Sequence, residues 1–431
     1  MATSAELHAR RIAAVPRGIG HATQIYAKRA KNAEIWSEDG KRYIDFAAGI
    51  AVVNTGHQHP KVVSAVQKQL ESFSHVCFQV TPHESYVTIA ERLNAMAPVH
   101  GPAKTMLVST GAEAVENSVK IARAFTGRPG IVSFSGGFHG RTHMGMALTG
   151  KVVPYKKGFG PFPSDIYNAP FPNTYHGVTS EQSLNALKSL FKYQADPSNI
   201  AGIIIEPVQG EGGFNIAPFD FLRDLRALCD EHGILLIGDE IQTGFARTGK
   251  MFGLEHAGVK ADIVTLAKGL AGGLPLAAIT GRADVMDGAN PGGLGGTYAG
   301  NPVACAAAHA VMDVIAEEKL CDCANAIGKF IMNRCREMKG RSNLNCIGDV
   351  RGLGAMCAVE LVKDGNSHEP APQLTQALLK AANERGLILL SCGTNGNVIR
   401  FLSPLTASDA IVREGMDIFE ASLLDAVSKT A

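Results

Sequence analysis

The chain has 431 residues, more than one hydrophobic core usually contains, and this length predicts two domains. Its 41 lysines and arginines are balanced by 40 aspartates and glutamates, so the sequence lacks the basic excess typical of proteins that bind nucleic acids or membrane surfaces. The longest apolar stretches have the length of strands, which excludes a transmembrane helix. The nine cysteines follow no disulfide or metal-ligand spacing, and the N-terminus does not resemble a secretory signal. These features predict a cytoplasmic protein without a metal site.

The first elements in chain order are a polar arm and a hairpin. Residues 33–49 are expected to form two short strands across a turn at Asp39 and Gly40. Residues 59–73 then carry Val62, Val66 and Leu70 at helical spacing. We assign residues 1–58 to an N-terminal segment that packs with a smaller C-terminal domain.

From Thr105 onward, strand patterns alternate with helical patterns. Strands are predicted at residues 105–109, 130–134, 201–208, 233–239 and 262–269, and helices at residues 111–127 and 219–233. Residues 161–172, rich in proline, phenylalanine and asparagine, are predicted to form a loop. The alternation predicts an α/β domain over residues 59–318, with a mostly parallel sheet and helices on both faces.

Beyond Pro302 the pattern changes to two long helices, followed by short strands in residues 348–362, 386–393 and 397–404. This pattern predicts a smaller α+β domain over residues 319–431. The hinge between the domains is expected within residues 317–322.

Two apolar runs end abruptly in a charged residue, Asp239 in the first and Lys268 in the second. Because open α/β sheets bind ligands beyond the carboxyl ends of their strands, both side chains are expected in one crevice. Taken singly, such an aspartate can be a helix N-cap and such a lysine a surface residue. A lysine beside a carboxylate in an apolar cleft also suits pyridoxal phosphate: the amine forms a Schiff base, and the carboxylate keeps a proton on the pyridine nitrogen.

Further segments suit the remaining parts of such a cofactor. Ser109 to Ala112 follow a strand and open a helix, which is a common way to bind phosphate. Phe138, after the next strand, can lie flat on an aromatic ring or belong to the core. The glycine-rich run at residues 292–302 follows no clear strand and lacks the acidic partner of a dinucleotide site, so we interpret Thr297 as a phosphate ligand.

Six motifs of the chain together resemble the class III (subgroup II) aminotransferases of pyridoxal-phosphate fold type I, with a particular likeness to the 4-aminobutyrate aminotransferases of bacteria. They are STGAEA, FSGGFHGRT, EPVQGEGG, DEIQTGFARTGK, LAKGLAGGLPL and GGTYAGNP. The resemblance implies a large domain with a seven-stranded sheet, a smaller α+β domain and pyridoxal 5'-phosphate as cofactor. It also implies a homodimer with active sites at the subunit interface.

The resemblance also implies roles for individual residues. Lys268 forms the Schiff base, Asp239 bonds the pyridine nitrogen, and Gln242 contacts the ring hydroxyl. Phe138 stacks on the ring. The phosphate is held by Thr110, Gly111 and Ala112, and Thr297 reaches the phosphate bound by the other subunit.

The substrates follow from the same resemblance and from charge. 4-Aminobutyrate, with its amine at the cofactor, is glutamate without the α-carboxylate. Arg141 matches the residue that binds the carboxylate common to both, Arg400 matches the one that binds the α-carboxylate, and Glu211 matches the acid that neutralises Arg400 when no α-carboxylate is present. Ile50 and Ile241 are expected on the substrate side.

The reaction implied is transfer of the amine of 4-aminobutyrate to 2-oxoglutarate, giving succinate semialdehyde and glutamate. One methylene changes discrimination only modestly, so 5-aminovalerate, ornithine and acetylornithine remain alternative substrates. A pyridoxal-phosphate aminomutase or decarboxylase is a further alternative; Arg400 disfavours the aminomutase.

Overall fold

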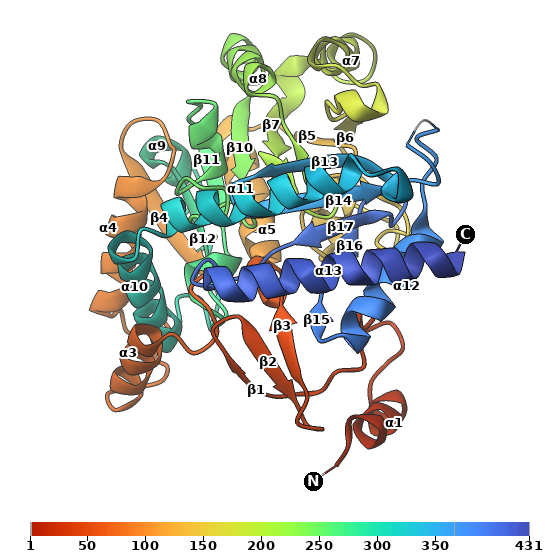
Figure 1. The fold of residues 1–431 in the computed structure, drawn as a ribbon. Helices are drawn as coiled ribbons and strands as arrows, with labels where there is room; N and C mark the ends of the chain where they lie inside the picture. Colours follow the sequence, from red (N-terminus) through yellow and green to blue (C-terminus); the bar gives the residue numbers. More distant parts are fainter. Residues whose placement is uncertain (1, 366, 431) are drawn as a thin grey trace.

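A large sheet forms the centre of the molecule (Figure 1). The computed structural model describes residues 2–365 and 367–430, and within these residues this sheet has seven strands. Neighbouring pairs from β11 to β6 are parallel, and β12 runs antiparallel to both of its neighbours. The mostly parallel sheet predicted from the sequence is therefore confirmed. Its order is β4 (Ala103–Val108), β12 (Ala277–Arg282), β11 (Ile263–Leu266), β10 (Leu235–Asp239), β7 (Ile200–Ile205), β5 (Gly130–Phe134) and β6 (Ile166–Ala169).

Both faces of this sheet are buried, which explains why its central strands read as continuous apolar runs. Successive side chains of a strand point to opposite faces. In β10, Leu235 and Ile237 pack in one hydrophobic cluster, whereas Leu236 packs in another. The first cluster includes residues of α5 (Gly111–Thr126), α6 (His143–Leu148) and α9 (Ala283–Met286). The second includes residues of α3 (Pro60–Leu70), α4 (Glu84–Met96), α7 (Ser180–Tyr193), α8 (Phe219–His232) and α10 (Pro302–Glu317).

The N-terminal hairpin pairs with a strand from the C-terminal part of the chain. Strands β1 (Ala27–Lys31), β2 (Glu34–Ser37) and β3 (Arg42–Asp45) are antiparallel, as the turn at Asp39 and Gly40 predicted for the last two. Strand β15 (Leu387–Ile388) then pairs in parallel with β3. The boundaries proposed for the domains remain predictions.

A second C-terminal sheet has the order β13 (Ile347–Leu353), β14 (Met356–Leu361), β17 (Val398–Phe401) and β16 (Leu390–Cys392). Figure 1 shows the long helices α11 (Leu320–Lys339) and α13 (Asp409–Thr430) running across this part of the molecule, with α12 (Pro372–Glu384) beside α13. Helix α10 ends at Glu317 and α11 begins at Leu320, with Lys319 between them in a left-handed conformation (φ 51°). The chain therefore turns sharply where the hinge is expected.

Two of the segments for which no helix or strand was predicted contain one of these elements. Residues 161–172 were expected as a loop, but they contain the edge strand β6, which pairs on one side with β5. Its burial is incomplete, so it lacks the apolar run that reveals the central strands. The polar N-terminal arm contains α1 (Ser4–Ala14), none of whose residues is buried. A reciprocal capping pair between Thr3 and Glu6 stabilises this helix locally.

The remaining elements are short. They are α2 (Ala48–Ala51), β8 (Val208–Gln209), β9 (Asn215–Ile216), η1 (Thr174–His176), η2 (Pro197–Asn199), η3 (Gly253–His256), η4 (Lys268–Leu270) and η5 (Ser342–Leu344).

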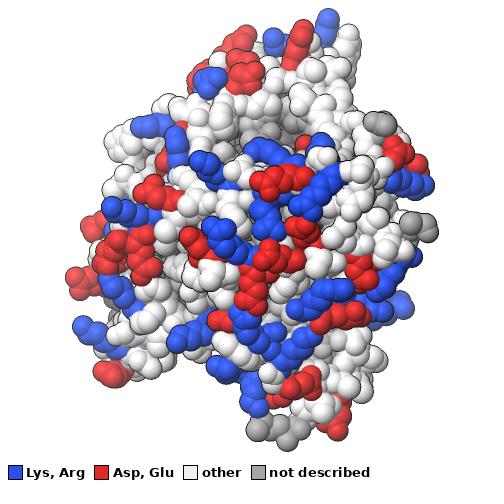
Figure 2. Space-filling model, viewed as in Figure 1, with Lys and Arg blue, Asp and Glu red and all other residues white. Residues whose placement is uncertain are grey.

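Acidic and basic side chains are interspersed over the face seen in Figure 2, in agreement with the balanced composition.

Candidate active site

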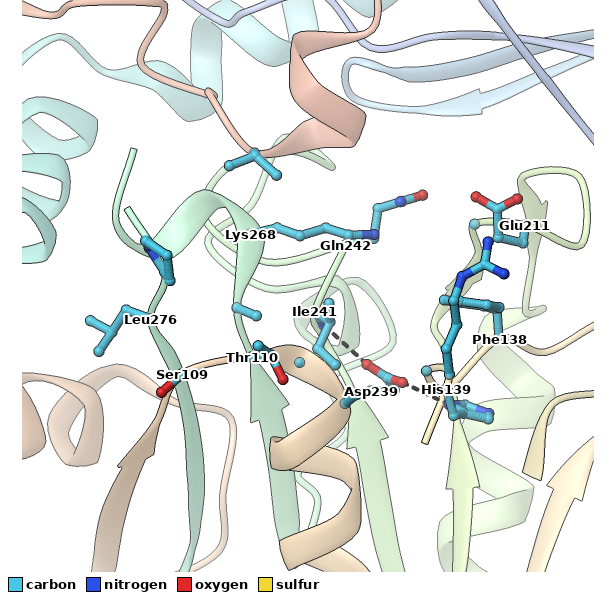
Figure 3. Close-up of a pocket in the computed structure, with 18 of the residues that line it drawn as sticks. Ser109, Thr110, Phe138, His139, Glu211, Asp239, Ile241, Gln242, Lys268 and Leu276 are labelled. Atoms are coloured by element: carbon cyan, nitrogen blue, oxygen red, sulfur yellow. Dashed lines mark hydrogen bonds and ion pairs between the residues drawn. The ribbon is translucent and has the colours of Figure 1, made fainter. Parts of the chain in front are cut away.

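A cavity of about 550 Å³ lies beyond the carboxyl ends of the central strands. The segments that follow β4, β5, β7, β10 and β11 each contribute to its lining, so one edge of the sheet brings together residues far apart in the sequence. Figure 3 shows Lys268 and Gln242 extending into this space above Asp239. The lining contains both charged residues that end the apolar runs, together with Thr110, Gly111, Ala112, Phe138, Arg141, Glu211, Ile241 and Gln242.

Lys268 stands at the point where β11 turns into η4. Its backbone adopts φ 43°, a left-handed conformation that costs a residue with a side chain on the order of 1–3 kcal/mol. Burial lowers the pKa of its amine to about 8, although the carboxylate of Glu211 opposes this shift. A large fraction of Lys268 is therefore neutral near pH 8, and a neutral amine can attack a carbonyl or accept a proton.

Asp239 ends β10 and is held by three donors. Its Oδ2 lies 2.7 Å from Nδ1 of His139, while its Oδ1 accepts hydrogen bonds from Thr265 Oγ1 (3.1 Å) and from the backbone N–H of Ile241 (3.2 Å). Burial would lower the pKa of His139, but the hydrogen bond to Asp239 and the carboxylate charge raise it overall. The carboxylate is therefore fixed in orientation at the wall of the cavity.

The N-terminus of α5 leaves two backbone amides free. The hydroxyl of Thr110 accepts a hydrogen bond from the backbone N–H of Glu113 (3.2 Å), and Glu113 Oε2 accepts from the amides of Ser109 and Thr110 (2.8 Å each). Within the described residues, the amides of Gly111 and Ala112 have no such partner. A Cβ atom at Gly111 would lie 2.9 Å from the side chain of Ile241, so glycine allows this close approach. These two amides can bind an anion.

The side walls of the cavity offer an aromatic ring and an unpartnered polar atom. The backbone N–H of Phe138 donates to Oε1 of Glu206 (2.8 Å), which fixes the segment that carries the ring. The side-chain oxygen of Gln242 is buried and has no hydrogen-bond partner among the described residues. Such an atom is costly unless a bound group satisfies it. An amine, a carboxylate, an acceptor amide and two free N–H groups together fit pyridoxal phosphate.

Glu206 is a buried acid beside the same site. Its two oxygens accept hydrogen bonds from the backbone N–H groups of Phe138 and Gly210 (2.8 and 2.9 Å). Burial raises its pKa to about 7, despite the opposing charge of His139. It thus ties the segment of Phe138 to the loop that carries Glu211.

Glu211 forms a buried ion pair with Arg400. Oε1 of Glu211 lies 2.6 Å from Nη1 of Arg400, whose side chain is 5% exposed. Burial lowers the pKa of Arg400 and raises that of Glu211, but the attraction between them reverses both shifts. The Nε atom of Arg400 is also buried and has no partner among the described residues. Arg400 therefore retains a donor for a second carboxylate.

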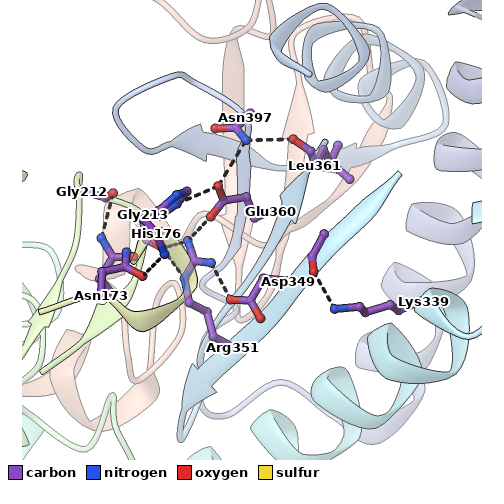
Figure 4. A network of polar contacts seen from close by, with 12 residues as sticks. Asn173, His176, Gly212, Gly213, Lys339, Asp349, Arg351, Glu360, Leu361 and Asn397 are labelled. Atoms are coloured by element: carbon purple, nitrogen blue, oxygen red, sulfur yellow. Dashed lines mark hydrogen bonds and ion pairs between the residues drawn. The ribbon is translucent and has the colours of Figure 1, made fainter. Parts of the chain in front are cut away.

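A polar network supports the Glu211 loop from behind (Figure 4). Arg351 donates from Nε and Nη2 to the backbone oxygen of Gly213 (2.9 and 2.6 Å). The same guanidinium is paired with Asp349 (2.7 Å) and Glu360 (2.8 Å). The loop is thereby anchored to β13 and β14 of the C-terminal sheet.

Three predicted site residues lie outside the cavity lining in a single chain: Ile50, Thr297 and Arg400, the last of which contacts the lining residue Glu211. Ile50 is 41% exposed, and Thr297 is exposed on the loop before α10. The sequence analysis also missed His139, Glu206 and Arg351. All three act through contacts between segments that lie 68 to 138 positions apart, although His139 directly follows Phe138 in the sequence.

Comparison with known proteins gives consistent matches over nearly the whole chain. The family model of class III aminotransferases matches residues 15–423. The chain is 53% identical over 418 residues to the 5-aminovalerate aminotransferase DavT of Pseudomonas putida, covering 97% of this chain and 98% of that protein. It is 51% identical over 418 residues to the 4-aminobutyrate aminotransferase GabT of Escherichia coli, with the same coverage of 97% and 98%.

A solved structure shares the fold. The crystal structure of an (S)-enantioselective omega-transaminase from Thermomicrobium roseum matches with a TM-score of 0.91 and 32% identity, covering 99% of both chains. In the part of the chain that the structure describes, no helix is long and apolar enough to cross a membrane.

Proposed function

Because this chain belongs to the class III aminotransferases, we propose that it transfers the amine of 4-aminobutyrate to 2-oxoglutarate, giving succinate semialdehyde and glutamate. The observation that carries this proposal is the buried pair of Arg400 and Glu211 beside Lys268. Arg400 can bind the α-carboxylate, which glutamate has and 4-aminobutyrate lacks. Glu211 can neutralise Arg400 when 4-aminobutyrate is bound.

Aminotransferases of this family use pyridoxal 5'-phosphate, which when bound supplies an electron sink for loss of a proton from the amine-bearing carbon. We assign the phosphate to the free amides of Gly111 and Ala112, next to Thr110. The ring nitrogen is assigned to Asp239 and the ring hydroxyl to the unpartnered oxygen of Gln242. Phe138 would cover the ring.

The chain's own residues then handle the proton and the charges. In its neutral form, Lys268 takes the proton from the amine-bearing carbon through Nζ. His139, Thr265 and the amide of Ile241 all hold Asp239 and fix the orientation of its carboxylate. With the cofactor bound, this carboxylate would stabilise a proton on the ring nitrogen.

The two amino donors differ by one carboxylate. We assign the carboxylate that they share to Arg141, which lines the cavity. When 4-aminobutyrate is bound, Glu211 keeps Arg400 neutralised; when glutamate is bound, its α-carboxylate replaces Glu211 on Arg400. We call conversion of 4-aminobutyrate the amine half-reaction and exchange between glutamate and 2-oxoglutarate the glutamate half-reaction.

5-Aminovalerate is the second candidate substrate, and its support is the similarity to DavT proteins at 52–53% identity. One additional methylene is worth about 1–3 kcal/mol in a hydrophobic pocket. The residues that bind the amine and the carboxylate, which both substrates have, therefore do not decide between them, and measured rates are needed.

We further propose a cytoplasmic homodimer in which Thr297 of one subunit completes the phosphate site of its partner. The exposed loop of Thr297 carries Tyr298 (69% exposed), and the adjoining segment carries Val80 (78% exposed). Gln79 donates a hydrogen bond to the backbone oxygen of Leu294, which places the two segments together. Nine unpaired cysteines support the cytoplasmic location.

The test is a turnover assay with purified protein, pyridoxal phosphate and 2-oxoglutarate. 4-Aminobutyrate and 5-aminovalerate are compared by kcat/KM, with the aldehyde products identified by mass spectrometry and a Lys268→Ala variant as control. We expect succinate semialdehyde to form with the higher kcat/KM. A higher kcat/KM for 5-aminovalerate would transfer the assignment to that substrate, and absence of aldehyde from both would refute it.

A further inference from the structure

Tyr155 lies beside the cavity without lining it. It belongs to the segment between α6 and β6, and it is 8% exposed. Lys151 of the same segment donates to the backbone oxygen of Gly393 (3.0 Å), and the N–H of Gly393 donates to the backbone oxygen of Glu211 (2.9 Å). The segment of Tyr155 and the loop of Glu211 are thus anchored at a common point.

The hydroxyl of Tyr155 contacts the acid that neutralises Arg400. It donates to Oε2 of Glu211 (3.3 Å), while Oε1 of Glu211 accepts from Arg400 (2.6 Å). Burial and the charge of Glu211 raise the pKa of Tyr155 to about 12, so the hydroxyl keeps its proton. Each oxygen of Glu211 therefore has its own donor, which fixes the carboxylate on Arg400.

The ring of Tyr155 contacts the residues at the other end of the substrate. The guanidinium of Arg141 lies over this ring, 4.8 Å from its centroid. The ring also packs against Phe138, with a centroid distance of 5.0 Å. Figure 3 shows Phe138 and Glu211 on the same side of the cavity. Tyr155 therefore joins the group that we assign to the shared carboxylate with the group that responds to the α-carboxylate.

We propose that Tyr155 is a positioning residue that sets the preference between the two amino donors. Its hydroxyl stabilises Glu211 on Arg400, the arrangement required by a donor without an α-carboxylate. Its ring orients Arg141, which both donors require. This inference rests on the proposed function, because it assumes that both donors use one site.

Separate substitutions distinguish the hydroxyl from the ring. Tyr155→Phe removes only the hydroxyl and is expected to lower the ratio of kcat/KM for the amine half-reaction to kcat/KM for the glutamate half-reaction about tenfold, as expected for one hydrogen bond to a charged group. The protein without substrate already holds Glu211 on Arg400, so this change should come mainly from a higher kcat/KM of the glutamate half-reaction, in which Glu211 must leave Arg400. Tyr155→Leu also removes the ring and should lower both half-reactions about tenfold or more. Tyr193→Phe, at a tyrosine that is 76% exposed on α7, is the matched control and should change neither.

A double substitution tests whether the hydroxyl acts through Glu211. In a Glu211→Ala background, Tyr155→Phe should have no further effect on the ratio of the two kcat/KM values, because the acceptor of its hydrogen bond is gone. A tenfold fall in the ratio that persists in this background would overturn the proposal. An unchanged ratio for Tyr155→Phe in the wild-type background would overturn it as well.

The test of Tyr155 and the test of the proposed substrate can fail independently of each other. The glutamate half-reaction is measured independently of 4-aminobutyrate, and the amine half-reaction can be followed with 5-aminovalerate, which also lacks an α-carboxylate. If 4-aminobutyrate is not converted, the substrate assignment fails while the Tyr155 measurements proceed with 5-aminovalerate.

Discussion

Replacing Arg400 with alanine should separate the two half-reactions. Arg400 is almost fully buried, and its Nη1 is paired with Glu211 at 2.6 Å while its Nε has no partner among the described residues. In the glutamate complex this guanidinium is assigned to the α-carboxylate. Loss of a buried, charge-assisted contact costs about 2–5 kcal/mol, which corresponds to roughly 30- to 4,000-fold in kcat/KM.

The amine half-reaction should respond differently, because 4-aminobutyrate has no group for Arg400 to bind. Glu211 loses its partner in the variant, but its side chain is 23% exposed and can be hydrated. We therefore expect a change below about threefold in this half-reaction. Arg400→Lys is the matched control: it keeps the charge but not the two-pronged geometry, so its loss in the glutamate half-reaction should be intermediate.

The assay is single-turnover absorbance of the bound cofactor, with 4-aminobutyrate or glutamate supplied separately. A loss of similar size in both half-reactions would mean that Arg400 supports the structure and does not recognise the α-carboxylate. The two-donor interpretation would then be wrong.

Three other predictions follow from the same geometry. Asp239→Asn should slow the amine half-reaction about 100-fold or more while the affinity for pyridoxal phosphate changes little, and near-normal single-turnover rates would contradict the role of this carboxylate. Burial lowers the pKa of Lys268 to about 8, because it disfavours the charged amine. The rate at which pyridoxal phosphate attaches covalently to the apoenzyme should therefore rise up to about pH 8 and then level off. A rate that still rises through pH 10 would indicate a lysine with an ordinary pKa. Arg351→Met should release the loop of Glu211, lowering Tm and slowing the amine half-reaction more than the glutamate half-reaction, whereas a lower Tm with unchanged half-reaction rates would show that the Arg351 network only stabilises the fold.

The parts of the fold that were predicted are those with strong local signals. Helix α5 and strand β10 have clear apolar patterns; α5 ends one residue before the predicted end, and β10 ends at Asp239 as expected. Strand β6 was missed because it is a half-exposed edge strand, and β12 because its sequence, AAITGR, has few of the residues that favour strands. Helix α1 depends on its own cap and buries no residue.

In the candidate site, too, the residues with a local sequence pattern were predicted, and those defined by contacts between distant segments were not. Lys268 and Asp239 were identified because each charge interrupts an apolar run, and sheet topology places strand ends together. Tyr155 gave no signal, since its contact with Glu211 joins residues 56 positions apart through a loop without a regular pattern. Thr297 is exposed in one chain, so its role depends on a second subunit.

All assignments in this cavity depend on Lys268 as the residue that holds pyridoxal phosphate. The most direct measurement is to load the purified protein with the cofactor, reduce it with borohydride, digest it and map the modified peptide by mass spectrometry. We expect a single modified lysine, Lys268, and no covalent attachment in Lys268→Ala. Modification of another lysine in the wild-type protein, or an unmodified Lys268 in protein that is catalytically active, would contradict the assignment of the site.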